Sequence, residues 1–133
     1  MIKQIAHLAF NVKDMKQSLE FYQNVLGFEK AFELMDYQNK PWIVYLKVCE
    51  NQYIELFYTT HTEFENKPNI GYAHLCLEVD DIHTIANHIR SKSVKLDVEP
   101  LMGKDNNYQC WVKDPDGNSI EFMQYGVNSL QRG

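Results

Sequence analysis

The feature that most constrains this 133-residue sequence is an internal repeat. The stretch AHLAFNVKD at residues 6–14 returns as AHLCLEVDD at residues 73–81, with Ala, His, Leu, Val and Asp recurring in the same order and at the same spacing. The pair Ile54-Glu55 returns as Ile120-Glu121, one position earlier than the first match requires. Because self-similarity of this kind indicates a duplicated supersecondary unit, the chain is predicted to contain two similar modules.

Both halves predict the same order of elements, namely a strand, a helix and three further strands. Apolar and polar residues alternate over 5–12, which is typical of a strand and places His7 on the face opposite Leu8 and Phe10. The same alternation places His74 opposite Leu75 in the second half. The later strands are predicted at 29–37, 42–48 and 53–58, and at 95–102, 108–113 and 119–125, with a Pro- and Gly-containing turn at 114–118.

The two helices carry apolar residues at helical spacing and a carboxylate that can cap the first turn. Asp14 is the expected cap of the first helix and Asp80 or Asp81 that of the second, while Gly27 supplies a left-handed stop. The residues expected on the buried sides are Met15, Leu19, Tyr22 and Leu26 in the first helix, and Ile82, Ile85, Ala86 and Ile89 in the second.

The whole chain is interpreted as one domain built from the two modules. Module one is expected at about 3–60 and module two at about 71–126. Between them lies a polar linker at about 61–70, which contains Pro68. The tail from Gly126 to Gly133 is expected to be loosely held.

Composition excludes several classes of partner. The net charge of −5 and the lack of a Lys/Arg cluster argue against nucleic-acid binding. No apolar run approaches the roughly 18 residues that a membrane-spanning helix needs, so no membrane partner is expected. Three cysteines without CxxC spacing fit reduced thiols, and we therefore expect a cytoplasmic protein.

Two histidines and two glutamates occupy equivalent positions of the repeat: His7, Glu55, His74 and Glu121. Each lies between residues that should be buried, and a carboxylate in such a strand must be solvated, paired or bound to a cation. If the modules pack as equivalent units, the four side chains converge. Two imidazoles and two carboxylates suit one divalent first-row metal, and zinc, nickel, cobalt, manganese and iron remain open.

The other histidines and the cysteines receive ordinary structural interpretations. His61 falls in the linker, and His83 and His88 are expected to be solvated helix residues. The cysteines are interpreted as small buried apolar residues, although Cys76 shares the His74 face and is a candidate contact of the site.

Several short stretches together form a recognisable signature. They are residues 7–12, 18–22 (SLEFY), 26–28 (LGF), 71–74 (GYAH), 114–118 (DPDGN) and the pair Ile120-Glu121. Spread from His7 to Tyr125, this pattern resembles the vicinal oxygen chelate superfamily, which includes glyoxalase I, bleomycin-resistance proteins, fosfomycin-modifying enzymes and extradiol dioxygenases.

The resemblance implies an α+β fold made of two βαβββ modules, whose curved mixed sheets form a cup around a bound metal ion. Proteins of this kind often form homodimers, so a homodimer is expected. The modules can pair within one chain or across the dimer. A small-molecule substrate, and a thiol adduct in particular, is the partner that this architecture implies.

The order His, Glu, His, Glu resembles the ligand pattern of glyoxalase I, which implies that His7, Glu55, His74 and Glu121 bind the metal, with zinc or nickel preferred. The implied reaction converts a 2-oxoaldehyde–thiol hemithioacetal into a 2-hydroxyacyl thioester through a metal-bound enediolate. Glu121 or Glu55 would be the catalytic base, and the resemblance favours Glu121.

Other members of the superfamily provide the alternatives. A dioxygenase or thiol transferase would use only His7, His74 and Glu121 as ligands. A non-catalytic protein that sequesters a small molecule such as an antibiotic would need no metal.

One position departs from the glyoxalase I pattern. Asn11 stands where those enzymes usually carry an Arg that contacts the glutathione carboxylate, and Asn cannot supply a bidentate cation. The thiol or the substrate is therefore expected to differ. Asn11, Cys76 and Trp111 are the candidate substrate-binding residues.

Overall fold

The computed structural model describes residues 1, 3–59 and 72–132, and the chain divides into two compact units, Met1–Asn66 and Lys67–Gly133. The predicted linker at about 61–70, with His61, lies outside the described residues.

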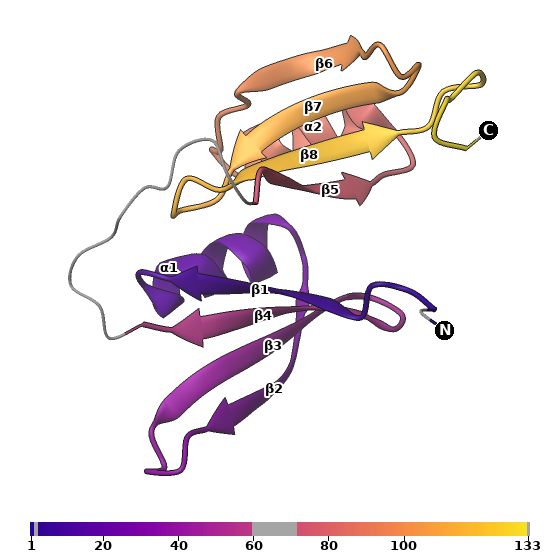
Figure 1. Cartoon of the computed structure of the whole chain (residues 1–133). Helices are drawn as coiled ribbons and strands as arrows, with labels where there is room; N and C mark the ends of the chain where they lie inside the picture. Colours follow the sequence, from indigo (N-terminus) through magenta and orange to yellow (C-terminus); the bar gives the residue numbers. More distant parts are fainter. Residues whose placement is uncertain (2, 60–71, 133) are drawn as a thin grey trace. The chain divides into compact units, whose positions relative to one another are not determined.

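The first unit is a four-stranded mixed sheet with one helical segment (Figure 1). The strand order is β1-β4-β3-β2, in which β1 runs parallel to β4 and the other neighbours are antiparallel. The elements in chain order are β1 (His7–Val12), the α-helix α1 (Met15–Leu19), the π-helix η1 (Glu20–Val25), β2 (Glu29–Met35), β3 (Pro41–Cys49) and β4 (Gln52–Tyr58).

The second unit repeats this topology. Its strand order is β5-β8-β7-β6, again with one parallel pair, β5 and β8, and two antiparallel pairs. The predicted α+β class with two βαβββ modules is therefore confirmed. The elements are β5 (His74–Glu78), α2 (Ile82–Ser91), β6 (Val98–Met102), β7 (Tyr108–Lys113) and β8 (Ser119–Gln124).

Each helix begins at an aspartate that accepts a backbone hydrogen bond. The Asp14 side chain accepts from the Gln17 N–H at 3.0 Å, and the Asp81 side chain accepts from the Thr84 N–H at 2.7 Å. Asp81 rather than Asp80 is thus the cap of the second helix. The hydrogen bonds from Thr84 hold the pKa of Asp81 below its ordinary value.

The first helix differs from the single α-helix that the spacing predicts. After α1 the chain continues as the π-helix η1, and the Leu26 N–H bonds to the Phe21 carbonyl five residues back. The wider turn buries the adjacent residues Phe21 and Tyr22 together. The predicted stop is confirmed, because Gly27 takes φ +78°.

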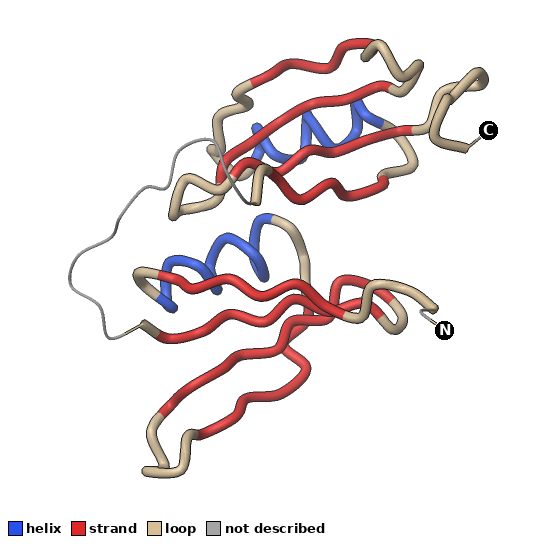
Figure 2. Tube along the Cα trace, viewed as in Figure 1, coloured by secondary structure: helices blue, strands red, loops and turns tan. Residues whose placement is uncertain are grey.

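The helix of each unit lies against one face of that unit's own sheet (Figure 2). Residues on this face form the core, while His7 and His74 are exposed, so the predicted side of each histidine is confirmed. A shift of one residue in the strand register would move the core residues to the opposite face of the sheet. Packing of the core therefore also determines the face on which His7 and His74 lie. The largest core residues include Tyr22, Leu46, Ile54 and Leu56 in the first unit and Ile82, Ile89, Ile120 and Val112 in the second.

The turn predicted at 114–118 is tightly specified. The Asp114 carboxylate accepts from the backbone N–H groups of Asp116 and Asn118, and Gly117 takes φ +82°. The turn joins β7 and β8 as an antiparallel hairpin, as predicted.

The expectation of a loosely held tail is wrong for the described residues up to Arg132. The Gly126 N–H donates to Asn107 Oδ1 at 3.2 Å, and the Leu130 N–H donates to the Asp105 carbonyl at 3.0 Å. Arg132 pairs with Glu78 at 2.9 Å. These partners are remote in the sequence, so the composition of the tail could not reveal them.

Within residues 1, 3–59 and 72–132, no helix has the length and apolar character needed to span a membrane.

Candidate metal centre

In the first unit, His7 and Glu55 lie close together on the sheet face that the helix does not cover. The parallel register pairs Ala9 of β1 with Glu55 of β4. His7 precedes Ala9 by two residues, so its side chain points to the same face of the sheet. His7 Nε2 lies 3.5 Å from Glu55 Oε2. The imidazole is accessible, whereas Glu55 is buried at 6% exposure.

The second unit builds the same pair from its own strands. The register pairs Cys76 of β5 with Glu121 of β8, and His74 again precedes the paired residue by two positions on the same face. His74 Nε2 lies 3.1 Å from Glu121 Oε2. Each predicted His therefore lies next to the predicted Glu of its own unit.

An aromatic ring flanks each pair. Tyr45 of β3 stands opposite Glu55, and its ring meets His7 edge-on at 6.3 Å between centroids. Trp111 of β7 stands opposite Glu121, and its ring meets His74 edge-on at 4.7 Å. These rings limit the orientations that the imidazoles can adopt.

Two groups beside the carboxylates have raised pKa values. The pKa of Tyr45 is raised mainly by the hydrogen bond of its hydroxyl with Glu55, and further by burial and by the Glu55 charge. Burial, followed by the Glu121 charge and a hydrogen bond with Glu121, raises the pKa of Cys76 to about 12. Both groups are therefore protonated near neutral pH.

The geometry of each pair fits two ligands of one metal ion. Two atoms that each lie about 2.1 Å from an ion are about 3.0–3.4 Å apart in neighbouring octahedral or tetrahedral positions. The Nε2–Oε2 separations of 3.5 Å and 3.1 Å come close to this range before any adjustment of the side chains. Imidazole nitrogen and carboxylate oxygen are donors that divalent first-row metals accept.

The described residues of each unit bring together one His–Glu pair. In the part of the chain that the structure describes, no group of three or more His, Cys, Asp or Glu side chains is placed to hold a metal ion. Among these described residues the four predicted ligands thus form two separate pairs, one in each unit.

The three candidate substrate-binding residues lie on the same uncovered faces. Asn11 is exposed on β1, opposite Phe57. Cys76 is exposed beside Glu121, and Trp111 is half-buried on the other side of that carboxylate.

The cysteine interpretation needs correction. All three thiols are free, but only Cys110 is buried, and burial raises its pKa to about 11. Cys49, the last residue of β3, is exposed, and so is Cys76, whose side chain lies on the face of β5 opposite the core. His83 and His88 are exposed on α2, as predicted.

Tyr45 is a residue of the site that the sequence reasoning missed. Its separation from Trp111 along the chain equals the separation of Glu55 from Glu121, so the repeat relates the two aromatic residues as it relates the two carboxylates. Extending the repeat to the middle strands would have found it.

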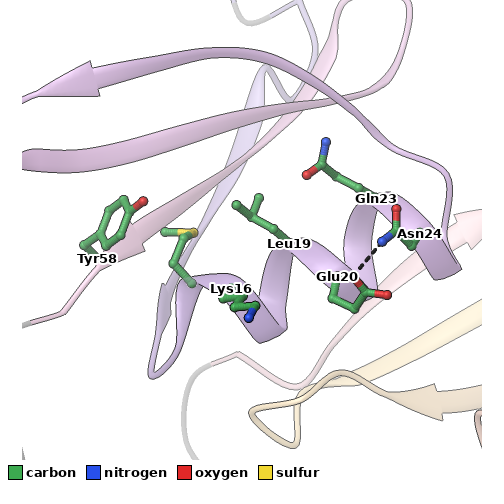
Figure 3. Close-up of a pocket in the computed structure, with 7 residues that line it drawn as sticks. Lys16, Leu19, Glu20, Gln23, Asn24 and Tyr58 are labelled. Carbon is green, nitrogen blue, oxygen red and sulfur yellow. Dashed lines mark hydrogen bonds between the residues drawn. The ribbon is translucent and has the colours of Figure 1, made fainter.

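A surface cavity of about 470 Å³ lies elsewhere in the first unit, between the helical segment and the end of β4 (Figure 3). Leu19 and Tyr58 line it together with polar helix residues, and Asn24 donates to Glu20 at its rim at 2.6 Å. None of the predicted ligands lines this cavity.

Two units of this topology, each presenting a His–Glu pair on its open sheet face, define a class of duplicated βαβββ proteins. The sequence profile of the glyoxalase/bleomycin resistance protein/dioxygenase superfamily matches residues 4–122. The chain belongs to this superfamily.

Similar proteins come from several bacteria. One named "Probable lactoylglutathione lyase" from Synechocystis sp. is 33% identical over 125 residues, which cover 90% of this chain and 94% of the relative. The "Lactoylglutathione lyase" of Neisseria meningitidis serogroup A is 30% identical over 127 residues, covering 91% and 90% of the two chains.

Solved structures share the fold. The crystal structure of the glyoxalase family protein from Enterococcus faecalis superposes with a TM-score of 0.77 at 23% identity, covering 91% of this chain and 97% of the other.

Proposed function

We propose that this chain is a metal-dependent lyase of the glyoxalase I type, which isomerises a 2-oxoaldehyde–thiol hemithioacetal to a 2-hydroxyacyl thioester. The observation that carries the proposal is the His–Glu pair that recurs, in register, on the open face of both units. The relatives named lactoylglutathione lyase support the reaction class.

The metal ligands of this proposal are His7, Glu55, His74 and Glu121. The two pairs meet around one divalent ion, zinc or nickel by preference, either within one chain or across a homodimer. A bound ion of this charge polarises two neighbouring substrate oxygens and makes the adjacent C–H more acidic.

Burial of Glu55 favours the four-ligand arrangement over a three-ligand one. Its side chain is 7% exposed, and a carboxylate at that depth needs a cation or strong donors. A dioxygenase-like or transferase-like centre with three ligands would leave this carboxylate without the cation.

Glu121 is the proposed base. Its side chain is 13% exposed against 7% for Glu55, so it has more room to approach a substrate carbon. The Glu121 carboxylate takes the proton from the carbon that bears the sulfur and hydroxyl groups, and the same carboxyl returns it to the neighbouring carbon. The hydroxyl proton of the first carbon passes to the oxygen of the second, so the first carbon becomes the thioester carbonyl and the second an alcohol carbon, with no net gain or loss of electrons.

Asn11, Cys76 and Trp111 are proposed to contact the substrate beside the metal. Asn11 can donate or accept single hydrogen bonds but cannot form the charged fork that an Arg offers to a carboxylate. We therefore propose that the thiol component differs from glutathione, or that glutathione is held by other groups.

The test is metal analysis combined with an isomerisation assay. Protein purified without a metal-affinity tag should contain a divalent metal and convert methylglyoxal plus a cellular thiol into a thioester. A chelator should abolish the activity and metal should restore it. His74→Ala should lose metal, whereas the control His83→Ala, which removes an exposed imidazole from α2, should retain it. Metal-loaded protein that is inert with glutathione and with the other cellular thiols would defeat the lyase proposal.

A further inference from the structure

Gln109 is a polar residue at a position of the repeat that is apolar in the first unit, where Ile43 occupies it. Its neighbours across the second sheet are also apolar, because the register pairs it with Leu101 of β6 and Met123 of β8. The Gln109 side chain is half-buried there. An amide in such surroundings needs a hydrogen-bond partner of its own.

The partner of the Gln109 amide is the indole ring of Trp111. Trp111 Nε1 donates to Gln109 Oε1 at 2.6 Å. The two residues are two positions apart on β7, so their side chains lie on the same, uncovered face of the sheet. The χ2 torsion of an aromatic residue has broad wells, and a bond to the single donor of the indole therefore selects one orientation of the ring.

The Trp111 ring in turn meets the imidazole of His74. The two ring centroids are 4.7 Å apart, and the interplanar angle is 66°. Because the His74 side chain is 38% exposed, few packed neighbours restrict it, and the edge of the indole has a large influence on its orientation. Gln109, Trp111 and His74 thus form a continuous series of side-chain contacts that ends at a candidate metal ligand.

Gly103 leaves room for this arrangement. A methyl group on its Cα would overlap Gln109 Nε2, the other end of the same amide, and would also crowd Asp105 Oδ1. Gly103 does not adopt a positive φ, so its backbone conformation is open to other residues. The absence of a side chain at this position is therefore what the Gln109 amide uses.

The first unit holds the corresponding ring in a different way. Tyr45 stacks on Phe32 with 4.2 Å between centroids and an interplanar angle of 22°, and its edge faces His7. The Ile43 side chain offers that ring no hydrogen-bonding group. Each unit therefore fixes the ring beside its histidine by its own means, a ring stack in the first unit and an amide in the second.

From these contacts we propose that Gln109 is a positioning residue, which fixes the Trp111 ring so that the ring keeps His74 oriented for metal binding. The inference rests on the proposed function, since His74 is a ligand of that centre. Loss of a group that orients a ligating imidazole typically costs about 10–100-fold in metal affinity. Because Gln109 acts through Trp111, its loss should fall near the lower end of this range.

The experiment compares Gln109→Leu with Gln124→Leu. The control is closely matched, because Gln124 Oε1 also accepts one hydrogen bond in the second unit, from the Ile82 N–H at 2.8 Å. Cobalt(II) is titrated into metal-free protein, and its visible absorption reports both affinity and coordination geometry. Gln109→Leu should weaken cobalt binding by about 10-fold and alter the spectrum, whereas Gln124→Leu should stay within about twofold of the wild type.

A measurement on metal-free protein tests the contact separately. The chain has two tryptophans, and NMR resolves their indole N–H groups, which Trp111→Phe assigns. In Gln109→Leu, the Trp111 N–H should exchange with solvent faster than in the wild type, whereas the Trp42 N–H should be unaffected. Equal exchange of the Trp111 N–H in both proteins would overturn the inference, whether or not the protein binds metal.

A double variant keeps the test sharp if Gln109→Leu alters the packing of the sheet. In a Trp111→Phe background, Gln109→Leu should have no further effect on cobalt affinity, since the donor that it holds is gone. Equal cobalt affinity and an equal spectrum for the wild type and Gln109→Leu, or equal losses in Gln109→Leu and Gln124→Leu, would overturn this inference alone. Wild-type protein that binds no cobalt, zinc or nickel would overturn the proposed function and, with it, the role given to Gln109.

Discussion

The two units share a topology and a His–Glu pair, but they surround that pair differently. His7 and Glu55 lie 3.5 Å apart with a tyrosine opposite the carboxylate, and His74 and Glu121 lie 3.1 Å apart with a tryptophan there. The duplicated register therefore places the proposed metal ligands, while the flanking residues distinguish the two copies. The two pairs can therefore differ in chemical role through the residues that neighbour them, such as Tyr45 in the first unit and Trp111 in the second.

The largest expected effect separates the two carboxylates by function. Glu121→Gln should lower kcat by about 10²–10⁴-fold, because a positioned general base contributes on that scale. Glu55→Gln should act chiefly through metal affinity, since this carboxylate is the more buried of the two. Steady-state isomerisation assays at saturating metal, together with metal titrations, measure the two effects separately.

Substitutions at the same two carboxylates distinguish the alternatives. A three-ligand centre predicts that Glu55→Ala keeps both metal and activity, because Glu55 would not coordinate. Loss of kcat in Glu55→Gln with metal fully bound, and an active Glu121→Gln, would reverse the roles given to the two units.

Much of this comparison could be predicted from the sequence, because the alternation of apolar and polar residues along a strand assigns each side chain to one face of the sheet. The repeat aligned His7 with His74 and Glu55 with Glu121, and the structure places each His beside its Glu. The alternation of apolar and polar residues was enough to predict that His7 and His74 lie on the face opposite the core.

Other features could not be predicted, because they depend on contacts between distant residues. The apolar spacing of the first helix predicted an α-helix throughout, but packing of both Phe21 and Tyr22 in the core accompanies a π-helical second half. The second sheet's edge strand begins at Val98 rather than 95, and the buried Leu96 precedes it. The tail is held by Asp105 and Asn107, which lie outside any local pattern.

A smaller effect is expected from making the second unit resemble the first. Trp111→Tyr places on the second sheet the residue type that the first sheet has opposite its carboxylate, and the new hydroxyl can donate to Glu121. We expect kcat to fall roughly 10-fold, which corresponds to one added hydrogen bond to a charged group of about 1.5 kcal/mol. Trp111→Phe is the control that removes the indole without adding a hydroxyl. Equal kcat values for these two variants would mean that the hydroxyl does not restrain Glu121.

The smallest expected effect is the change in Tm on removing a helix cap, because each unit has an aspartate that caps its helix. Asp81→Ala removes the 2.7 Å bond to the Thr84 N–H and should lower Tm by about 4 °C, as expected for a lost N-cap in a chain of this size. Asp14→Ala removes the corresponding 3.0 Å bond to the Gln17 N–H in the first unit. Thermal unfolding followed by circular dichroism compares the two losses.

The lowered pKa of Asp81 predicts how the stability that this cap contributes depends on pH. Its folded-state pKa lies below the ordinary value, so its ionised form stabilises the fold at pH values above the unfolded pKa. That contribution is lost as the pH falls through the lowered folded-state pKa. Asp81→Asn keeps a capping amide oxygen but cannot ionise, so the stability difference between wild type and Asp81→Asn should shrink as the solution is acidified. A difference that stays constant from neutral pH to below that pKa would show that the Asp81 charge does not stabilise α2.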